Sequence, residues 1–161
     1  MSVNPDQDQH RRNRLLSALR PRDYALLEPH LQIVPIGEGE FLHLPGEEIE
    51  QVYFLHKGIV SLMAISKEGD AIATASVGSE GAIGTIVGTG FVRAFTRALV
   101  HAPGVASRIE ASHFRRAVSK SETINSFRNT FQGEIKYTLT PEPGRSPART
   151  TRPSRRNRVR L

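Results

Sequence analysis

The sequence contains no cysteine and no tryptophan, and its unbroken apolar runs are short. The absence of cysteine excludes disulfides, iron–sulfur clusters and thiolate metal sites. A helix that spans a bilayer needs about 20 consecutive apolar residues, so none is expected. The N-terminal stretch MSVNPDQDQHRRNR is polar and lacks the apolar core of a signal peptide. We therefore expect a cytoplasmic protein that does not bind membranes.

The chain also lacks the residue patterns of common enzymes. It has no Gly-x-Ser-x-Gly motif, no recognisable pair of catalytic acids and no Walker-type loop. Its six histidines form neither a His-x-His pair nor an i,i+4 pair, the spacings that zinc sites use: His10, His30, His43, His56, His101 and His113. The sequence therefore predicts neither an enzyme nor a metal-binding protein.

The net charge of +6 is concentrated at the C-terminal end. From Pro141 onward there are seven arginines and one acidic residue, Glu142, which gives +6. Residues 1–140 carry 15 basic and 15 acidic residues and sum to zero. This tail is rich in Pro, Arg, Ser and Thr and has almost nothing apolar to bury, so we expect it to be disordered.

The first structured region is predicted to hold two short helices in the stretch RNRLLSALRPRDYALLEPHL. An apolar stripe begins at Leu15 and Leu16 and ends before Pro21. Asp23 is then placed as the N-cap of a second helix, which Pro29 closes.

From about Gln32 to Glu110 the pattern indicates β-structure. Runs of Ile, Val, Phe and Leu are separated by turn signals about 8 to 12 residues apart, which is typical of a sandwich, barrel or roll. The turn signals include Lys57-Gly58, Glu68-Gly69 and Pro103-Gly104. They predict a strand from Val52 to the first turn, a second over Ile59–Ser66 and a third over Ala71–Val77.

A helix is predicted after Glu110, with Ser112 as its N-cap. Apolar and small residues follow at helical spacing: Phe114, Ala117, Val118, Ser121, Ile124 and Phe127. This stripe packs on the roll or on another subunit. Because the pattern ends after about two heptads, we expect any homodimer or heterodimer through this helix to be weak.

Three stretches in this order resemble the cyclic-nucleotide-binding domain of Crp/Fnr-type transcription regulators: NRLLSAL, PGEEIEQVYFLHKGIVSLM, and VGSEGAIG followed by TRALV. The resemblance covers roughly Arg14 to Phe131. It implies a mainly β fold, a jelly-roll-like β-roll of about eight strands with short N-terminal helices and one C-terminal helix. The expected division is a disordered lead (1–13), the domain (14–131) and a disordered basic tail (132–161).

In that family, a phosphate-binding cassette grips the ligand. Amides of a short helix and an arginine hold the cyclic phosphate, and a glutamate after a glycine holds the ribose 2′-hydroxyl. Gly84 matches the glycine, and Thr85 stands where the glutamate belongs. Losing one charge-assisted hydrogen bond costs about 1.5–3 kcal/mol, roughly ten- to a hundred-fold in affinity.

The cassette arginine is ambiguous. Arg93-Ala94 and Arg97-Ala98 both match the family pattern inexactly, and the best register of the next strand places Phe95 at the arginine and Thr96 at the serine. Arg93 and Arg97 are expected on one face of a strand. The candidate ligand-binding residues are Gly84, Thr85, Arg93, Thr96 and Arg97. We expect weak or no binding of cyclic AMP, and no cofactor is certain; the candidate ligand is a cyclic nucleotide or another small phosphorylated effector.

Other interpretations stay open at this point. The glycines of the loop are explained equally by turns and bulges, and Glu80 by a turn. Nothing after Arg128 matches the winged helix-turn-helix of full-length relatives, which predicts a ligand-sensing domain truncated before its DNA-binding domain, with a replaced or out-of-frame C-terminus. DNA is not expected as a partner of this chain alone. The alternatives are an interaction protein that pairs with full-length relatives, and sequence-blind nucleic-acid binding through the arginine-rich tail.

Overall fold

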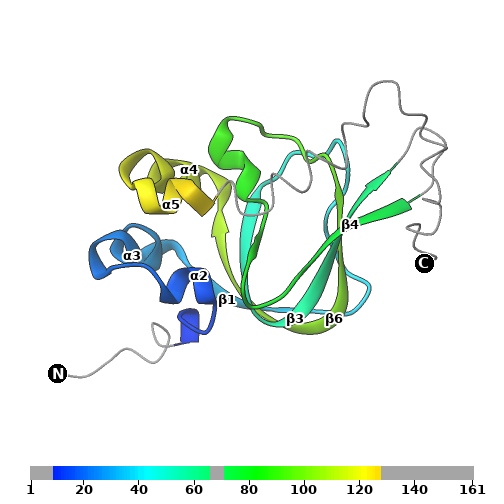
Figure 1. Ribbon diagram of the computed structural model, residues 1–161, viewed down its shortest axis with the longest axis horizontal. Coiled ribbons are helices and arrows are strands. Elements are labelled where there is room, and N and C mark those ends of the chain that lie inside the picture. The colour runs from blue at the N-terminus through cyan, green and yellow to red at the C-terminus, as the bar shows by residue number, and fades with distance from the viewer. Residues whose placement is uncertain (1–8, 66–70, 128–161) are drawn as a thin grey trace.

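The computed structural model describes residues 9–65 and 71–127, which form a β-roll with a group of helices at one end (Figure 1). The helices are α2 (Arg14–Ser17), α3 (Pro21–Leu27), η1 (Glu28–His30), η2 (Thr85–Thr89), α4 (Ala111–Lys120) and α5 (Glu122–Phe127). The strands are β1 (Gln32–Ile36), β2 (Phe41–His43), β3 (Gln51–Ile65), β4 (Ala71–Val77), β5 (Ala82–Ile83) and β6 (Arg97–Glu110).

The strands form one antiparallel sheet that folds over on itself. Its order is β1-β6-β3-β4, and β2 pairs with β6 while β5 pairs with β3. The long strands β3 and β6 pair along most of their length and carry the sheet from one layer of the roll to the other. The predicted mainly β roll with flanking helices is confirmed.

The prediction of two separate strands around Lys57-Gly58 is wrong, because β3 runs through this position. The register between β3 and β6 shifts on both sides of Lys57, so the glycine marks a bulge inside a bent strand. Pro103-Gly104 likewise lies inside β6 instead of in a turn. A Cβ atom added at Gly104 would overlap the carbonyl of Lys57. Both glycines thus allow the close approach of two paired strands, and the described roll has six strands, not about eight.

The two N-terminal helices are confirmed, but the predicted cap is not. Pro21 occupies the first position of α3, and Asp23 lies in its first turn. Proline suits this position because the first amides of a helix have no partner inside it. The cap of α2 is Asn13, whose Oδ1 accepts hydrogen bonds from the amides of Leu15 (3.0 Å) and Leu16 (3.2 Å).

The predicted C-terminal helix is divided in two at Ser121. The first helix, α4, begins at Ala111, not after a cap at Ser112, and Ser121 has an extended backbone. Its hydroxyl caps α5 by accepting a hydrogen bond from the amide of Ile124 at 3.1 Å. Phe114, Ile124 and Phe127 are buried in this chain's own core, so the stripe packs on the roll. Dimerisation through these helices stays a prediction.

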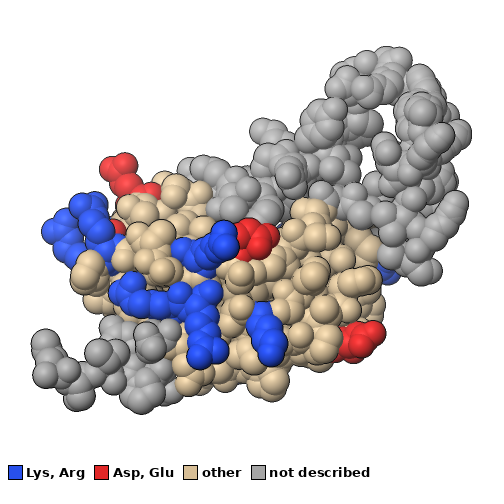
Figure 2. All heavy atoms as spheres, turned by 60° about the horizontal axis from the view of Figure 1, so that its bottom comes forward, with Lys and Arg blue, Asp and Glu red and all other residues tan. Residues whose placement is uncertain are grey.

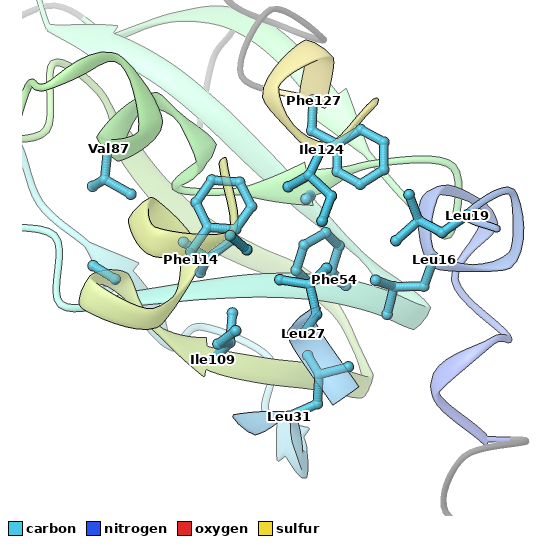
Figure 3. Packing of buried hydrophobic residues seen from close by; sticks show 14 of the residues in the cluster. Leu16, Leu19, Leu27, Leu31, Phe54, Val87, Ile109, Phe114, Ile124 and Phe127 are labelled. Carbon is cyan, nitrogen blue, oxygen red and sulfur yellow. The ribbon is translucent and has the colours of Figure 1, made fainter. Parts of the chain in front are cut away.

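The core consists of two apolar clusters. One lies between the helices and the sheet, and Figure 3 shows Leu16, Leu27, Phe54 and Phe114 converging there from α2, α3, β3 and α4. The ring centroid of Phe54 lies 6.2 Å from that of Phe114. The second cluster fills the inside of the roll, with Leu55, Val60, Val77, Ile83 and Val100 fully buried. Among the described residues, no helix is long and apolar enough to span a membrane.

The expectations for the two ends fall mostly outside the described residues, as does the predicted turn at Glu68-Gly69. Residues 1–8 and 128–161, which include the predicted basic tail, are not described. Residues 9–13 were assigned to the disordered lead from sequence, yet they are part of the structure. His10 and Asn13 are buried there, and hydrogen bonds to Ser107 of β6 and to the carbonyl of Leu55 in β3 satisfy their side chains.

Candidate ligand-binding site

The cassette segment, residues 84–97, connects β5 to β6. It begins with the short helix η2, which is flanked by two glycines in the left-handed conformation, Gly84 (φ 92°) and Gly90 (φ 101°). A non-glycine residue is strained in this conformation. The sequence pattern of glycines thus marks the two ends of η2.

Gly84 also lies close to β3. A Cβ atom added there would be 2.9 Å from the carbonyl oxygen of Gln51 and 3.3 Å from Cγ2 of Ile49. The start of η2 is therefore fixed against the start of β3. Thr85 follows as a buried residue, with 7% of its surface exposed. The predicted turn role of Glu80 fits its hydrogen bond, in which Oε2 accepts from the amide of Gly78 at 3.1 Å.

The second half of the cassette segment is tied to the turn before β3. The amide of Ile49 donates to the carbonyl of Val92 (2.7 Å), and the amide of Ala94 donates to the carbonyl of Glu47 (2.9 Å). The amide of Gly46 donates to the carbonyl of Ala94 (2.9 Å). Both ends of the cassette segment therefore rest on residues 46–51, which include Gly46 and Glu47 of the Pro-Gly-Glu sequence motif.

Arg93 and Arg97 do not lie on one strand, so that prediction is wrong. Arg93 forms an isolated bridge with Glu48, and Arg97 begins β6 after a bend. The exposed guanidinium of Arg93 donates through Nη1 to the carbonyl of Gly46 at 2.9 Å. Arg93 thus holds the turn that supports the cassette segment.

Thr96 and Arg97 have different surroundings. Thr96 is buried, and its hydroxyl lies 3.4 Å from Nε2 of His43. Burial lowers the pKa of His43 to about 4, although Glu47 opposes the shift. Arg97 stacks its guanidinium over the ring of Phe41 at 5.8 Å, and its buried Nε has no hydrogen-bond partner among the described residues. Of the five predicted site residues, Gly84 and Thr85 lie at the start of η2, whereas Thr96 and Arg97 lie at the start of β6.

Sequence reasoning missed the aromatic surface of the cassette segment. Phe91 and Phe95 are 51% and 42% exposed, and their rings meet edge to face with centroids 5.2 Å apart. Val92 between them is exposed as well. Exposed phenylalanines that contact each other are unusual on a monomer surface. Their spacing of four residues was visible, but nothing in the sequence indicated that the loop turns them outward.

A groove of about 650 Å³ lies where η2 meets the C-terminal helices. Gly88 lets η2 approach α4, since a Cβ atom added there would be 3.1 Å from Cγ2 of Val118. The remaining lining is mostly polar and charged and includes Arg115, Lys120, Glu122 and Asn125. The groove is thus a mixed polar surface next to the cassette segment.

A second polar cluster lies away from the cassette segment, on β3 and β6. The hydroxyl of buried Ser107 lies 2.6 Å from Nδ1 of His10 and 2.6 Å from Nε2 of His56. Burial, followed by the neighbouring His10 and Arg12, lowers the pKa of His56 to about 4. These residues are far apart in the sequence, so no spacing pattern could reveal the cluster. In the described part of the chain, no group of three or more His, Asp or Glu side chains could hold a metal ion.

No protein-family model matches the sequence, and no curated protein matches it. Solved structures do match. A mutant regulatory subunit of a cAMP-independent protein kinase A from Trypanosoma brucei, bound to cAMP, has a TM-score of 0.69 at 17% identity. The match covers 82% of this chain and 48% of that one. The chain has the fold of a cyclic-nucleotide-binding domain.

Two bacterial structures have the same cyclic-nucleotide-binding fold. The N-terminal domain of a transcriptional regulator from Streptomyces coelicolor has a TM-score of 0.57 at 18% identity, over 82% of this chain and 92% of that one. A cyclic nucleotide-binding-like protein from Brucella abortus has a TM-score of 0.52 at 21% identity, over 72% of this chain and 99% of that one. These neighbours are regulatory or binding proteins, and this chain spans about half the length of the kinase subunit.

Proposed function

We propose that this chain is the ligand-sensing domain of a Crp/Fnr-type transcription regulator, and that its cassette is altered at the two positions that hold a cyclic nucleotide. The effector is then a cyclic nucleotide bound weakly, or another small phosphorylated molecule. The observation that carries the proposal is the start of η2, where left-handed Gly84 is fitted against Gln51 and precedes buried Thr85.

The fold supports this proposal without deciding the ligand. A neighbour whose kinase is named cAMP-independent was solved with cAMP in a mutant form, and a relative from Trypanosoma cruzi was solved with guanosine. Proteins of this fold have therefore been solved with different ligands. A binding domain of this kind senses its effector and needs no catalytic step.

The altered positions supply the chemical argument. A threonine hydroxyl is neutral, so it replaces the charge-assisted hydrogen bond of a glutamate with a weaker one. Phe95, at the place of the arginine in the best register, carries no charge to meet a phosphate. It is 42% exposed, so a longer charged side chain fits there without entering the core.

The proposal is tested by restoring both groups in the variant Thr85→Glu/Phe95→Arg. Thermal denaturation is measured for it and for the unchanged chain with cyclic AMP, cyclic GMP, cyclic di-GMP and guanosine. Ligand at a hundred times its dissociation constant adds about 2.7 kcal/mol of stability. We expect the restored variant to be stabilised by cyclic AMP at concentrations that leave the unchanged chain unaffected.

The matched control is Thr85→Glu/Phe91→Arg. It has the same composition and net charge, and it places the arginine on the other exposed ring of the same loop. Tight binding of cyclic AMP by the unchanged chain would contradict the proposal that the cassette is altered. If cyclic AMP stabilises both variants equally, Phe95 does not occupy the arginine position. If the restored variant folds but cyclic AMP does not stabilise it, the proposed ligand site is wrong.

A further inference from the structure

Charge is unevenly distributed over the folded body, although its total is near zero. We use the term helical end for residues 9–30 and 111–127, which carry eight basic and three acidic residues, a net charge of +5. Residues 31–110 carry five basic and nine acidic residues, a net charge of −4. Figure 2 shows Lys and Arg side chains gathered on the half of the molecule that holds the helices.

The fold brings the basic residues of separate segments together at this end. Arg11 places its guanidinium 4.2 Å from the ring centre of Tyr24 on α3. The ring of His30 in η1 stacks on that of His113 in α4, with centroids 3.8 Å apart and planes 10° apart. These two contacts connect the segment before α2 to α3, and η1 to α4, so that one surface carries arginines from several segments.

Most of these cations are available to a partner. Arg12, Arg14, Arg22 and Arg116 are exposed, and none has a carboxylate within 4.0 Å among the described residues. Arg20 is 4.0 Å from Asp23, the limit of an ion pair. An accumulation of cations without counter-charges creates a positive potential that attracts anions.

The lowered pKa of His30 agrees with a positive potential at the helical end. Burial first, and then the neighbouring His113 and Arg116, lower the pKa of His30, while Glu110 opposes them. The groove beside α4 continues the basic surface, because Arg115 and Lys120 line it. An anion at this end would relieve repulsion among groups that the fold already holds close together.

We propose that the helical end is a binding surface for the phosphate backbone of nucleic acids, contacted without regard to base sequence. Seven of its eight basic residues are arginines, whose planar guanidinium pairs with phosphate through two hydrogen bonds. The described surface has no element that reads bases, so the contact is electrostatic. This surface adjoins the cassette segment at the groove between η2 and α4, but the proposal does not rest on the proposed ligand.

A membrane surface is a poorer partner for the same charge. A helix that lies on a bilayer inserts apolar side chains beside its basic ones. Among the residues that the structure describes, the large apolar side chains that are exposed all lie outside the helical end: Phe41, Ile59, Phe91, Val92 and Phe95. On α3 and α4, Leu27 and Phe114 point into the core instead. The described residues of the helical end thus offer cations without an exposed large apolar side chain to insert into lipid.

The test uses the full chain, because the C-terminal arginines are a competing source of binding. Fluorescence anisotropy is measured with a short labelled duplex and a short labelled single strand of mixed sequence, over a series of salt concentrations. The variant Arg22→Gln/Arg116→Gln removes two charges from the helical end. The control Arg155→Gln/Arg158→Gln removes the same charge from the tail, and thermal denaturation checks that both variants are folded.

We expect the helical-end variant to bind at least tenfold more weakly at low salt. The slope of log K against log salt should fall by about 2, since each phosphate contact contributes about 0.9. The proposal is overturned if this variant keeps the affinity and slope of the unchanged chain while the tail variant loses them. It is also overturned if the chain binds neither nucleic acid, or if it prefers phosphatidylserine vesicles to both.

Discussion

Nδ2 of Asn13 donates a hydrogen bond of 2.8 Å to the carbonyl oxygen of Leu55, and a second of 2.8 Å to that of Gly81. Its Oδ1 accepts from two amides at the start of α2. This one buried side chain therefore joins the N-terminal helices to β3 and to the turn before β5.

Asn13→Ala should destabilise the fold by about 3 kcal/mol. The change removes an N-cap, worth about 0.5–2 kcal/mol, and leaves buried carbonyl groups without a donor, at about 1–3 kcal/mol each. Asn13→Asp separates the two roles, because aspartate caps a helix as well as asparagine but cannot donate to a carbonyl. Urea denaturation should show both variants to be less stable than the original chain. If the aspartate variant is as stable as the original chain, Asn13 stabilises the fold only as a helix cap.

The prediction for the cassette segment uses two glycines with nearly the same backbone angle. Gly84 and Gly90 are both left-handed, so alanine is strained at either position by about 1 kcal/mol. A Cβ atom at Gly90 meets nothing within 4 Å, whereas at Gly84 it would press on the carbonyl of Gln51. We expect Gly84→Ala to cost about 2 kcal/mol more than Gly90→Ala, since a tightly packed contact must shift. Equal losses in urea denaturation would argue against the close approach to β3.

The core prediction compares two phenylalanines. Phe114 is fully buried beside Phe54, and Phe95 is exposed. Phe114→Ala should destabilise the domain by about 3–5 kcal/mol because it removes apolar contacts and leaves a cavity. Phe95→Ala should change the free energy of unfolding by less than about 0.5 kcal/mol. Similar losses for the two variants would show that the exposed ring also supports the fold.

Two turn signals of the sequence marked the correct positions but predicted the wrong structure. Lys57-Gly58 and Pro103-Gly104 do mark departures from regular backbone, but these are bulges within the paired strands β3 and β6. A glycine that is needed for a positive φ and a glycine that is needed because another backbone segment lies close look the same in a sequence. The residue against which each glycine packs lies far along the chain, so local pattern could not separate a turn from a bulge.

The candidate ligand-binding site shows the same limit of prediction from local sequence patterns. The start of η2 was located from the match at Gly84, because that match rests on local sequence order. The surroundings of Arg93 and Thr96 could not be found this way, since their partners, Gly46 and His43, are reached only through the folding of the roll. The separation of charge between the two ends of the body was hidden for the same reason, because residues 9–30 and 111–127 meet only in the fold.

Stability should fall in mild acid because of buried His43 and half-buried His56. The pKa of His43 is lowered to about 4 by burial, against the weaker influence of Glu47, and that of His56 to about 4 by burial, His10 and Arg12. The unfolded chain, with a histidine pKa near 6.5, then binds protons before the folded one does. The stabilisation is complete above about pH 6.5 and is lost as the pH falls toward 4, and for His43 it amounts to about 3 kcal/mol.

Urea denaturation between pH 7 and pH 4.5 measures this loss. The double variant His43→Gln/His56→Gln carries neutral side chains that cannot take up a proton, so its stability should vary less with pH than that of the unchanged chain. His101→Gln, at an exposed position, controls for the loss of a histidine as such. If the double variant loses stability as steeply as the unchanged chain, other groups cause the acid sensitivity, and folding does not lower the pKa of the two histidines.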